Sequence, residues 1–223
     1  IGRSVAGTMD VDDDGIFDIF HGSDKEAWLI PGDDPKTSSG ATTVVTKPRP
    51  TGGSFSTLAR QIGSSYAATD FAATVFVPGN DGDVGDLTVG PAGDVNGDGV
   101  DDVVIGAPEA DPGGRTDAGK VYIIYGRPAP FAEEVELSEV GVSVPGLAIA
   151  GAEGVNGGEP GDGLGAAVGG GFDLTGDGID DALVGAPFAD MGALPLDSGQ
   201  AYVIAPVAPS TVEGLALTGS AGA

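Results

Sequence analysis

One nine-residue pattern of acidic residues and glycine occurs three times, and its residue types are those that hold hard cations. The copies span residues 10–18, 94–102 and 173–181, each with an acid at positions 1, 5 and 9 and glycine at position 6. Oxygen side chains at positions 1, 3, 5 and 9, with the main-chain carbonyl at position 7, predict an all-oxygen cage of the kind that calcium prefers. The predicted ligands are Asp10, Asp12, Asp14, Ile16 and Asp18 in the first loop, Asp94, Asn96, Asp98, Val100 and Asp102 in the second, and Asp173, Thr175, Asp177, Ile179 and Asp181 in the third.

Other interpretations of these loops are weaker. Asp, Asn and Gly favour turns without any cation, but three copies of one arrangement favour a shared cation-binding role. An EF-hand needs an acid at position 12 and helical flanks, whereas His21, Ile105 and Val184 stand there among β-branched residues. Magnesium keeps more water and fewer protein ligands. The sequence therefore predicts up to three Ca²⁺ ions, with four carboxylates in the first loop and three in each of the others.

The elements around the loops are predicted to be short strands, so that the fold class is all-β. Each repeat has the order strand, acidic turn, strand, bend, loop, strand, and fourth strands are expected near residues 74–77, 147–150 and 215–218. The bend is Gly-Ala-Pro at residues 106–108 and 185–187 but is degraded in the first copy. Trp28, Tyr122 and Tyr202 share one register, which predicts packing between repeats. Residues 131–140 are predicted as strand or loop rather than helix.

Composition limits the classes of function. The 223 residues include 34 acidic and 9 basic side chains, a net charge of −25, one His and no Cys. Such a charge repels phosphate backbones and argues against nucleic-acid binding. The absence of Cys excludes a thiolate zinc site, and no apolar run has the ~20 residues of a membrane span. Gly and Pro, 41 and 16 residues, fall between the short apolar runs.

The chain is predicted to be a single unit over residues 1–223, with approximate repeats 1–84, 85–163 and 164–223. Residues 33–60 carry four of the nine basic side chains and are predicted to be an insertion or long loop in the first repeat. Because binding is often carried by loops, this segment is also our candidate for a variable contact.

Residues 1–6, 93–99 and 104–108 resemble the FG-GAP repeat, which builds the seven-bladed β-propeller head of integrin α subunits and occurs in many bacterial surface proteins. The resemblance implies one four-stranded blade per repeat, with calcium held in a hairpin of each blade. The family's Phe-Gly is changed, since Ile1, Gly85 and Leu164 replace Phe and Asp86 replaces one Gly. Propellers close with ~4–8 blades, so three repeats predict a segment of a larger propeller.

The sequence supports three hypotheses about the function of the protein. The first is a calcium-binding extracellular module for adhesion, protein–protein interaction or surface assembly, with a protein or surface-glycan partner and with further blades or neighbouring subunits. The second is a polysaccharide-active or other hydrolytic propeller enzyme, which we disfavour because the acids are largely used as ligands and His21 is expected at a strand end. The third is a structural subunit of a surface layer or appendage. Asp101 and Asp180, beside the ninth position, are expected to be solvated turn residues.

Overall fold

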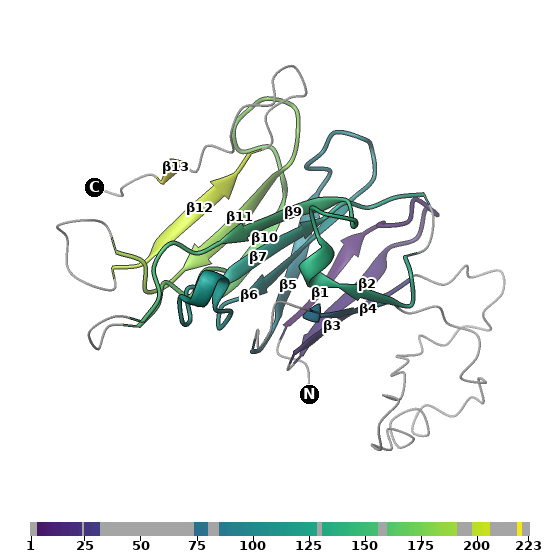
Figure 1. Cartoon of the computed structure of the whole chain (residues 1–223). Coiled ribbons are helices and arrows are strands. Elements are labelled where there is room, and N and C mark those ends of the chain that lie inside the picture. The colour runs from purple at the N-terminus through teal and green to yellow at the C-terminus, as the bar shows by residue number, and fades with distance from the viewer. Residues whose placement is uncertain are drawn as a thin grey trace, which may run out of the picture.

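The computed structural model arranges the chain as three β-sheets that stand side by side (Figure 1). It describes residues 4–23, 25–31, 74–79, 85–128, 131–155, 160–190, 198–205 and 218–219, so the expected insertion at 33–60 lies outside the described residues. The described residues contain strands and two 3₁₀ turns, η3 (Pro112–Gly114) and η4 (Leu137–Glu139), but no α-helix. The all-β prediction is confirmed.

Each sheet begins with an antiparallel hairpin whose turn is one of the acidic loops. Its strands are short and rich in apolar residues, and alternate residues of β2 and β3 are buried, as in a sheet with one covered face. The first sheet contains β1 (Ser4–Met9), β2 (Asp18–Ser23), β3 (Glu26–Ile30) and β4 (Thr74–Val77). The second contains β5 (Thr88–Gly93), β6 (Asp102–Ala107), β7 (Lys120–Ile124) and β9 (Gly146–Ala150). The third contains β10 (Ala167–Phe172), β11 (Asp181–Ala186), β12 (Gln200–Ile204) and β13 (Thr218–Gly219).

The first sheet departs from the expected four strands because β8 (Glu134–Glu136) joins it as a fifth. This strand comes from the connection between β7 and β9 of the second sheet and pairs in parallel with β4. Val135 points inward between two exposed glutamates, and Leu137 of η4 is fully buried. Strand β8 therefore covers the outer edge of the neighbouring sheet, which protects an edge that would otherwise be free to pair.

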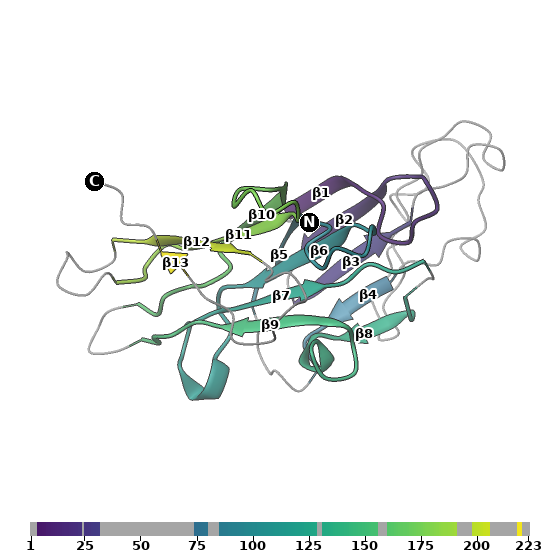
Figure 2. The ribbon, with the colours of Figure 1, turned by 90° about the horizontal axis from the view of Figure 1, so that it is seen from above.

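The hydrophobic core lies between the sheets and forms two layers. One cluster joins the first and second sheets around Phe20, Ile105 and Tyr122, and the other joins the second and third sheets around Val104 and Ile123. Strand β6 is buried at every residue because the second sheet is covered on both faces. Seen from above, β1, β5 and β10 gather together while the sheets spread away from them (Figure 2).

The aromatic residues in the shared register follow this layering. Tyr122 is fully buried in the first cluster, and Tyr202 packs against the second. Trp28 is only partly buried, because no described sheet stands in front of the first one. Packing between repeats is thus seen for the two tyrosines.

Glycines set how closely two sheets approach. A Cβ on Gly22 would overlap the carbonyl of Leu87, and a Cβ on Gly106 would overlap the carbonyl of Gly165. Both contacts are made with the main chain of the following sheet, so neither glycine can be replaced without moving a backbone. The equivalent Gly185 in the third sheet meets only Ala167 of its own sheet, at 3.5 Å.

We expect Gly106→Ala to destabilise the protein by about 1–3 kcal/mol, because the added methyl forces the second and third sheets apart. Gly185→Ala is the matched control at the same place in the next repeat, and its effect should stay within about 0.5 kcal/mol. Urea unfolding of the two variants and the wild type measures both values. Equal losses in the two variants would contradict the role of close sheet contact.

Candidate functional site: three acidic hairpin loops

The three acidic loops connect the first two strands of each sheet and project from the same side of the molecule (Figure 1). Position 6 adopts a positive φ in every loop, with values of 86° at Gly15, 93° at Gly99 and 89° at Gly178. Glycine reaches this region without strain. Position 4 also has a positive φ, and there the first loop uses Asp13 at 57°. The backbone thus bends in the same way in all three copies.

The aspartate at position 1 organises each loop by accepting main-chain N–H groups. Asp94 Oδ1 accepts the N–H groups of Gly97 and Asp98 at 2.7 and 3.0 Å, and its Oδ2 accepts that of Gly99 at 2.8 Å. Asp10 and Asp173 make equivalent bonds in their own loops. In the third loop these bonds, led by the one from Gly178, lower the pKa of Asp173. These bonds therefore hold Asp173 in its charged form, and they fix the orientation of the position-1 carboxylate in each loop.

The aspartate at position 9 begins the second strand of each sheet and is buried. Asp18, Asp102 and Asp181 are at most 1% exposed, and each accepts the main-chain N–H of position 2. Asp102 also accepts the N–H of Gly126 at 2.8 Å. Even so, burial raises the pKa of Asp102 to about 7. A negative charge on Asp102 is thus costly unless a positive charge accompanies it.

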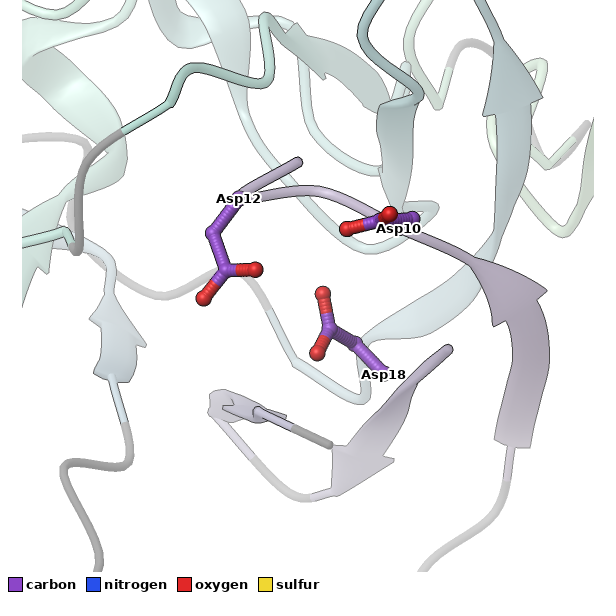
Figure 3. A group of neighbouring side chains, drawn as sticks. All are labelled: Asp10, Asp12 and Asp18. Carbon is purple, nitrogen blue, oxygen red and sulfur yellow. The ribbon is translucent and has the colours of Figure 1, made fainter. Parts of the chain in front are cut away.

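The first loop brings three of its predicted ligands together. One carboxylate oxygen from each of Asp10, Asp12 and Asp18 lies within 4.8 Å of the others, and Figure 3 shows the three side chains turned toward one common space. Oδ1 of Asp12 is buried and has no hydrogen-bond partner. Burial, followed by the charges of Asp14 and Asp10, raises the pKa of Asp12. An orphaned buried oxygen beside two other carboxylates fits a bound cation.

The second and third loops differ from the first at position 3, where Asn96 and Thr175 stand in place of the carboxylate of Asp12. Asp98 turns toward the loop itself, where its Oδ1 accepts the N–H of Val100 and its Oδ2 accepts the side-chain amide of Asn96. Asp177 likewise accepts the N–H of Ile179, as Asp14 accepts that of Ile16 in the first loop. Oδ1 of Asp181 is buried without a hydrogen-bond partner. In the second and third loops the predicted ligands thus lie in one hairpin each. Among the described residues, however, only the first loop brings oxygens of three carboxylates within 4.8 Å of one another.

The role of position 8 was missed by sequence reasoning. Asp101 and Asp180 are not simply solvated turn residues, because each bonds to the preceding sheet. Oδ2 of Asp101 accepts the main-chain N–H of Asp10 at 3.0 Å, and Oδ2 of Asp180 accepts that of Asp94 at 3.2 Å. The first acidic loop is thereby tied to the second, and the second to the third. The available signal was the recurrence of Asp at position 8 of the second and third copies, where the first copy has Phe17.

The donor set fits a hard divalent cation. It consists of carboxylate, amide, hydroxyl and carbonyl oxygens, which suit calcium, magnesium or manganese rather than soft metals. Position 7 contributes its N–H to position 5 in each loop, and its carbonyl as a ligand remains a prediction.

Comparison with known protein families agrees with the repeat pattern. The model of the FG-GAP repeat matches residues 87–124 and 164–204. The chain carries FG-GAP repeats. The two matched segments run from the first strands of the second and third sheets to β7 and β12, so each includes one acidic loop. The resemblance found from the sequence is confirmed over these two segments, so the second and third sheets are FG-GAP blades. No curated protein matches the chain significantly.

The first prediction from the site concerns the bond between blades at position 8. Asp101→Ala removes the acceptor for Asp10 N–H, whereas Asp101→Asn keeps a side-chain oxygen there. Both variants lose one negative charge, so they differ mainly in the hydrogen bond. We expect the Ala variant to be about 1 kcal/mol less stable than the Asn variant in urea unfolding. Indistinguishable stabilities would show that this bond contributes nothing.

The second prediction from the site concerns the raised pKa of Asp102. In the absence of divalent cations, the folded carboxyl keeps its proton up to about pH 7, whereas the unfolded one releases it near its ordinary pKa of 3.8. Between these two pH values the folded state binds more protons than the unfolded state. The contribution of Asp102 to the free energy of unfolding should therefore fall as pH rises through this window. The slope should be at most about 1.4 kcal/mol per pH unit.

Urea unfolding at a series of pH values in a chelator measures this slope. Asp102→Asn should remove it, while Asp13→Asn controls for the loss of one negative charge in an exposed loop residue. If the free energy of unfolding changed with pH in parallel for the wild type and Asp102→Asn, the slope could not be assigned to Asp102.

Proposed function

We propose that this protein is a calcium-binding extracellular propeller module for adhesion, protein–protein interaction or surface assembly. The observation that supports it best is the first acidic loop, where the carboxylates of Asp10, Asp12 and Asp18 converge and one buried oxygen lacks a partner. Like charges held this close in a partly buried site repel one another, and a divalent cation between them removes that cost.

The proposed ligands follow the repeat. In the first loop they are the side chains of Asp10, Asp12, Asp14 and Asp18 with the carbonyl of Ile16. In the others they are the equivalent residues, namely Asp94, Asn96, Asp98, Asp102 and the Val100 carbonyl, and Asp173, Thr175, Asp177, Asp181 and the Ile179 carbonyl. Five protein oxygens per loop suit calcium, which takes 6–8 oxygens, better than magnesium, which keeps several waters.

Cation binding would contribute directly to folding stability. The position-9 aspartates are buried at the start of the second strand of each blade, and their charge is best tolerated beside a cation. A cation that binds the folded loops and not the unfolded chain stabilises the fold by mass action. Calcium would therefore hold the hairpins that face one side of the molecule, where a partner can be met.

The extracellular location is part of the same proposal. Low-affinity calcium sites fill where calcium is abundant, outside the cytosol. Among the residues that the structure describes, none forms a helix with the length and hydrophobicity needed to cross a bilayer. The FG-GAP repeats support a role in protein interaction, and a protein or surface glycan is the partner class that we propose.

Calcium titration tests the proposal. We expect up to three ions per chain and a rise in melting temperature of several degrees relative to chelator, since ligand binding to the folded state raises stability by about 2.7 kcal/mol at a hundredfold excess over Kd. Asp14→Asn, Asp98→Asn and Asp177→Asn should each remove or weaken one ion. Isothermal titration calorimetry of the three variants measures the stoichiometry.

Asp13→Asn is the matched control, because it removes an acid from the first loop at a position that is not a proposed ligand. It should leave the stoichiometry unchanged. Magnesium at the same concentration should raise the melting temperature less than calcium does. Equal melting in calcium and in chelator would rule out the proposed function.

A further inference from the structure

The second acidic loop differs from the other two in that it places a side-chain amide directly before a glycine. The residues at positions 3 and 4 are Asn96 and Gly97 in the second loop, Asp12 and Asp13 in the first, and Thr175 and Gly176 in the third. An asparagine followed by glycine is open to attack by the glycine nitrogen on the side-chain carbonyl carbon, because glycine has no side chain that would block this approach. The second loop thus holds a reactive pair that the other two lack.

The conformation of the loop favours this glycine and leaves it open to water. Gly97 has a φ of 75°, in the left-handed region that glycine reaches without strain. Gly97 is exposed and Asn96 is half-buried, so water reaches the peptide bond between them. Once asparagine stands at position 3, the turn itself therefore provides the reactive pair.

Asp94 holds a carboxylate beside the nitrogen that would attack. Its Oδ1 accepts the N–H of Gly97 at 2.7 Å. A general base must lie within about 2.6–3.2 Å of the atom whose proton it removes, and this distance falls in that range. The N–H groups of Asp98 and Gly99 fix the same carboxylate in place. Asp94 is therefore positioned to take the proton of Gly97 as its nitrogen attacks.

The side-chain amide of Asn96 is held at both of its polar atoms. Its Oδ1 accepts the main-chain N–H of Asp98 at 2.8 Å, and its Nδ2 donates to Oδ2 of Asp98 at 3.0 Å. The bond to the residue two positions on folds the side chain back toward its own main chain, as in an Asx turn. The N–H of Asp98 also stabilises the negative charge that develops on Oδ1 when the side-chain carbonyl is attacked, as an oxyanion hole does.

We propose that Asn96 and Gly97 form a site of spontaneous deamidation, which Asp94 and the main-chain N–H of Asp98 promote when divalent cations are absent. The nitrogen of Gly97 forms a bond to Cγ of Asn96 while its proton passes to Asp94. Water relays this proton to Nδ2, the bond from Cγ to Nδ2 breaks, and ammonia leaves a cyclic imide. One water molecule then opens the imide, at Cγ to give aspartate or at the main-chain carbonyl of residue 96 to give isoaspartate.

The products change the second loop in two ways. Aspartate at residue 96 gives position 3 a carboxylate, as Asp12 does in the first loop, and removes the amide that now bonds to Oδ2 of Asp98. Isoaspartate lengthens the main chain by one methylene group and disturbs the turn. The reaction therefore slowly changes the charge and shape of one proposed cation site. Its effect on cation binding rests on the proposed function, whereas the reaction itself does not.

Peptide mapping by mass spectrometry tests the proposal, because an amide gains mass when it becomes an acid whereas isomerisation of an aspartate leaves the mass unchanged. The chain contains a second Asn-Gly pair at residues 156–157, and trypsin cleavage after Arg115 and Lys120 separates it from Asn96. In chelator, Asn96 of the folded protein should convert on the order of tenfold faster than in urea, where the base and the N–H donor are lost. In urea, Asn96 and Asn156 should convert at similar rates.

Two variants separate the role of Asp94 from a general effect on the protein. Asp94→Asn keeps a side-chain oxygen near Gly97 but removes the base, so that the rate at Asn96 in the folded protein should fall to about the rate in urea. Asp173→Asn is the matched control, because Asp173 accepts the N–H of Gly176 in the same way in the third loop. It should leave the rate at Asn96 unchanged. Circular dichroism shows whether both variants fold, and the comparison of folded and unfolded wild type needs no variant.

Two results would overturn the proposal. The first is a rate at Asn96 in the folded wild type, in chelator, that is no higher than the rate in urea. The second is an unchanged rate in a folded Asp94→Asn variant.

A calcium arm keeps this proposal apart from the proposed function. Because Asp94 and Asn96 are both proposed ligands, saturating calcium should slow the conversion on the order of tenfold, since the base is then occupied. Fast conversion in chelator that calcium does not slow would support the deamidation site and contradict the role of these two residues as ligands. Slow conversion in chelator would contradict the deamidation site, and the calcium titration would still test the ligands.

Discussion

Successive blades approach one another so closely that their main chains touch, and much of the rest of the molecule follows from this contact. The carbonyl of Leu87 occupies the space of a side chain at Gly22, and the carbonyl of Gly165 does so at Gly106. Because β1, β5 and β10 are held side by side, the apolar faces of the sheets close into two buried layers. The three acidic loops are brought to one side of the molecule for the same reason.

The same close approach concentrates negative charge. Asp101 reaches the main chain beside Asp10 while its neighbour Asp102 is buried behind it. Burial raises the pKa of Asp102 to about 7, and a buried oxygen of Asp12 is left without a partner. Backbone N–H groups satisfy part of this charge at positions 1 and 9. The buried carboxylate oxygens that lack a hydrogen-bond partner belong to Asp12 and Asp181, which are both proposed calcium ligands.

The first blade has diverged from the other two at its exposed end. It lacks the Gly-Ala-Pro bend, carries Phe17 in place of the linking aspartate and has His21 where the other blades have Ile or Val. The equivalent positions in the second and third blades face the preceding blade, whereas the positions of the first blade that face the following blade remain apolar and well buried. The family model matches the second and third repeats and not this one, in keeping with where the divergence lies.

Strands and loops were predictable from the sequence because they depend on local pattern. Alternating β-branched residues indicated most strands, including 74–77, and the repeated acids with glycine indicated three hairpin loops of one geometry. The short strand β8 could not be predicted, because three residues carry little signal and its partner β4 belongs to another blade. The position-8 links were likewise out of reach, since the residues that they join lie 86 and 91 positions apart. Which apolar side chains are covered, so that Val95 is buried and Leu174 is exposed, is decided only by tertiary packing, because exposure is a property of neighbours that the local sequence does not contain.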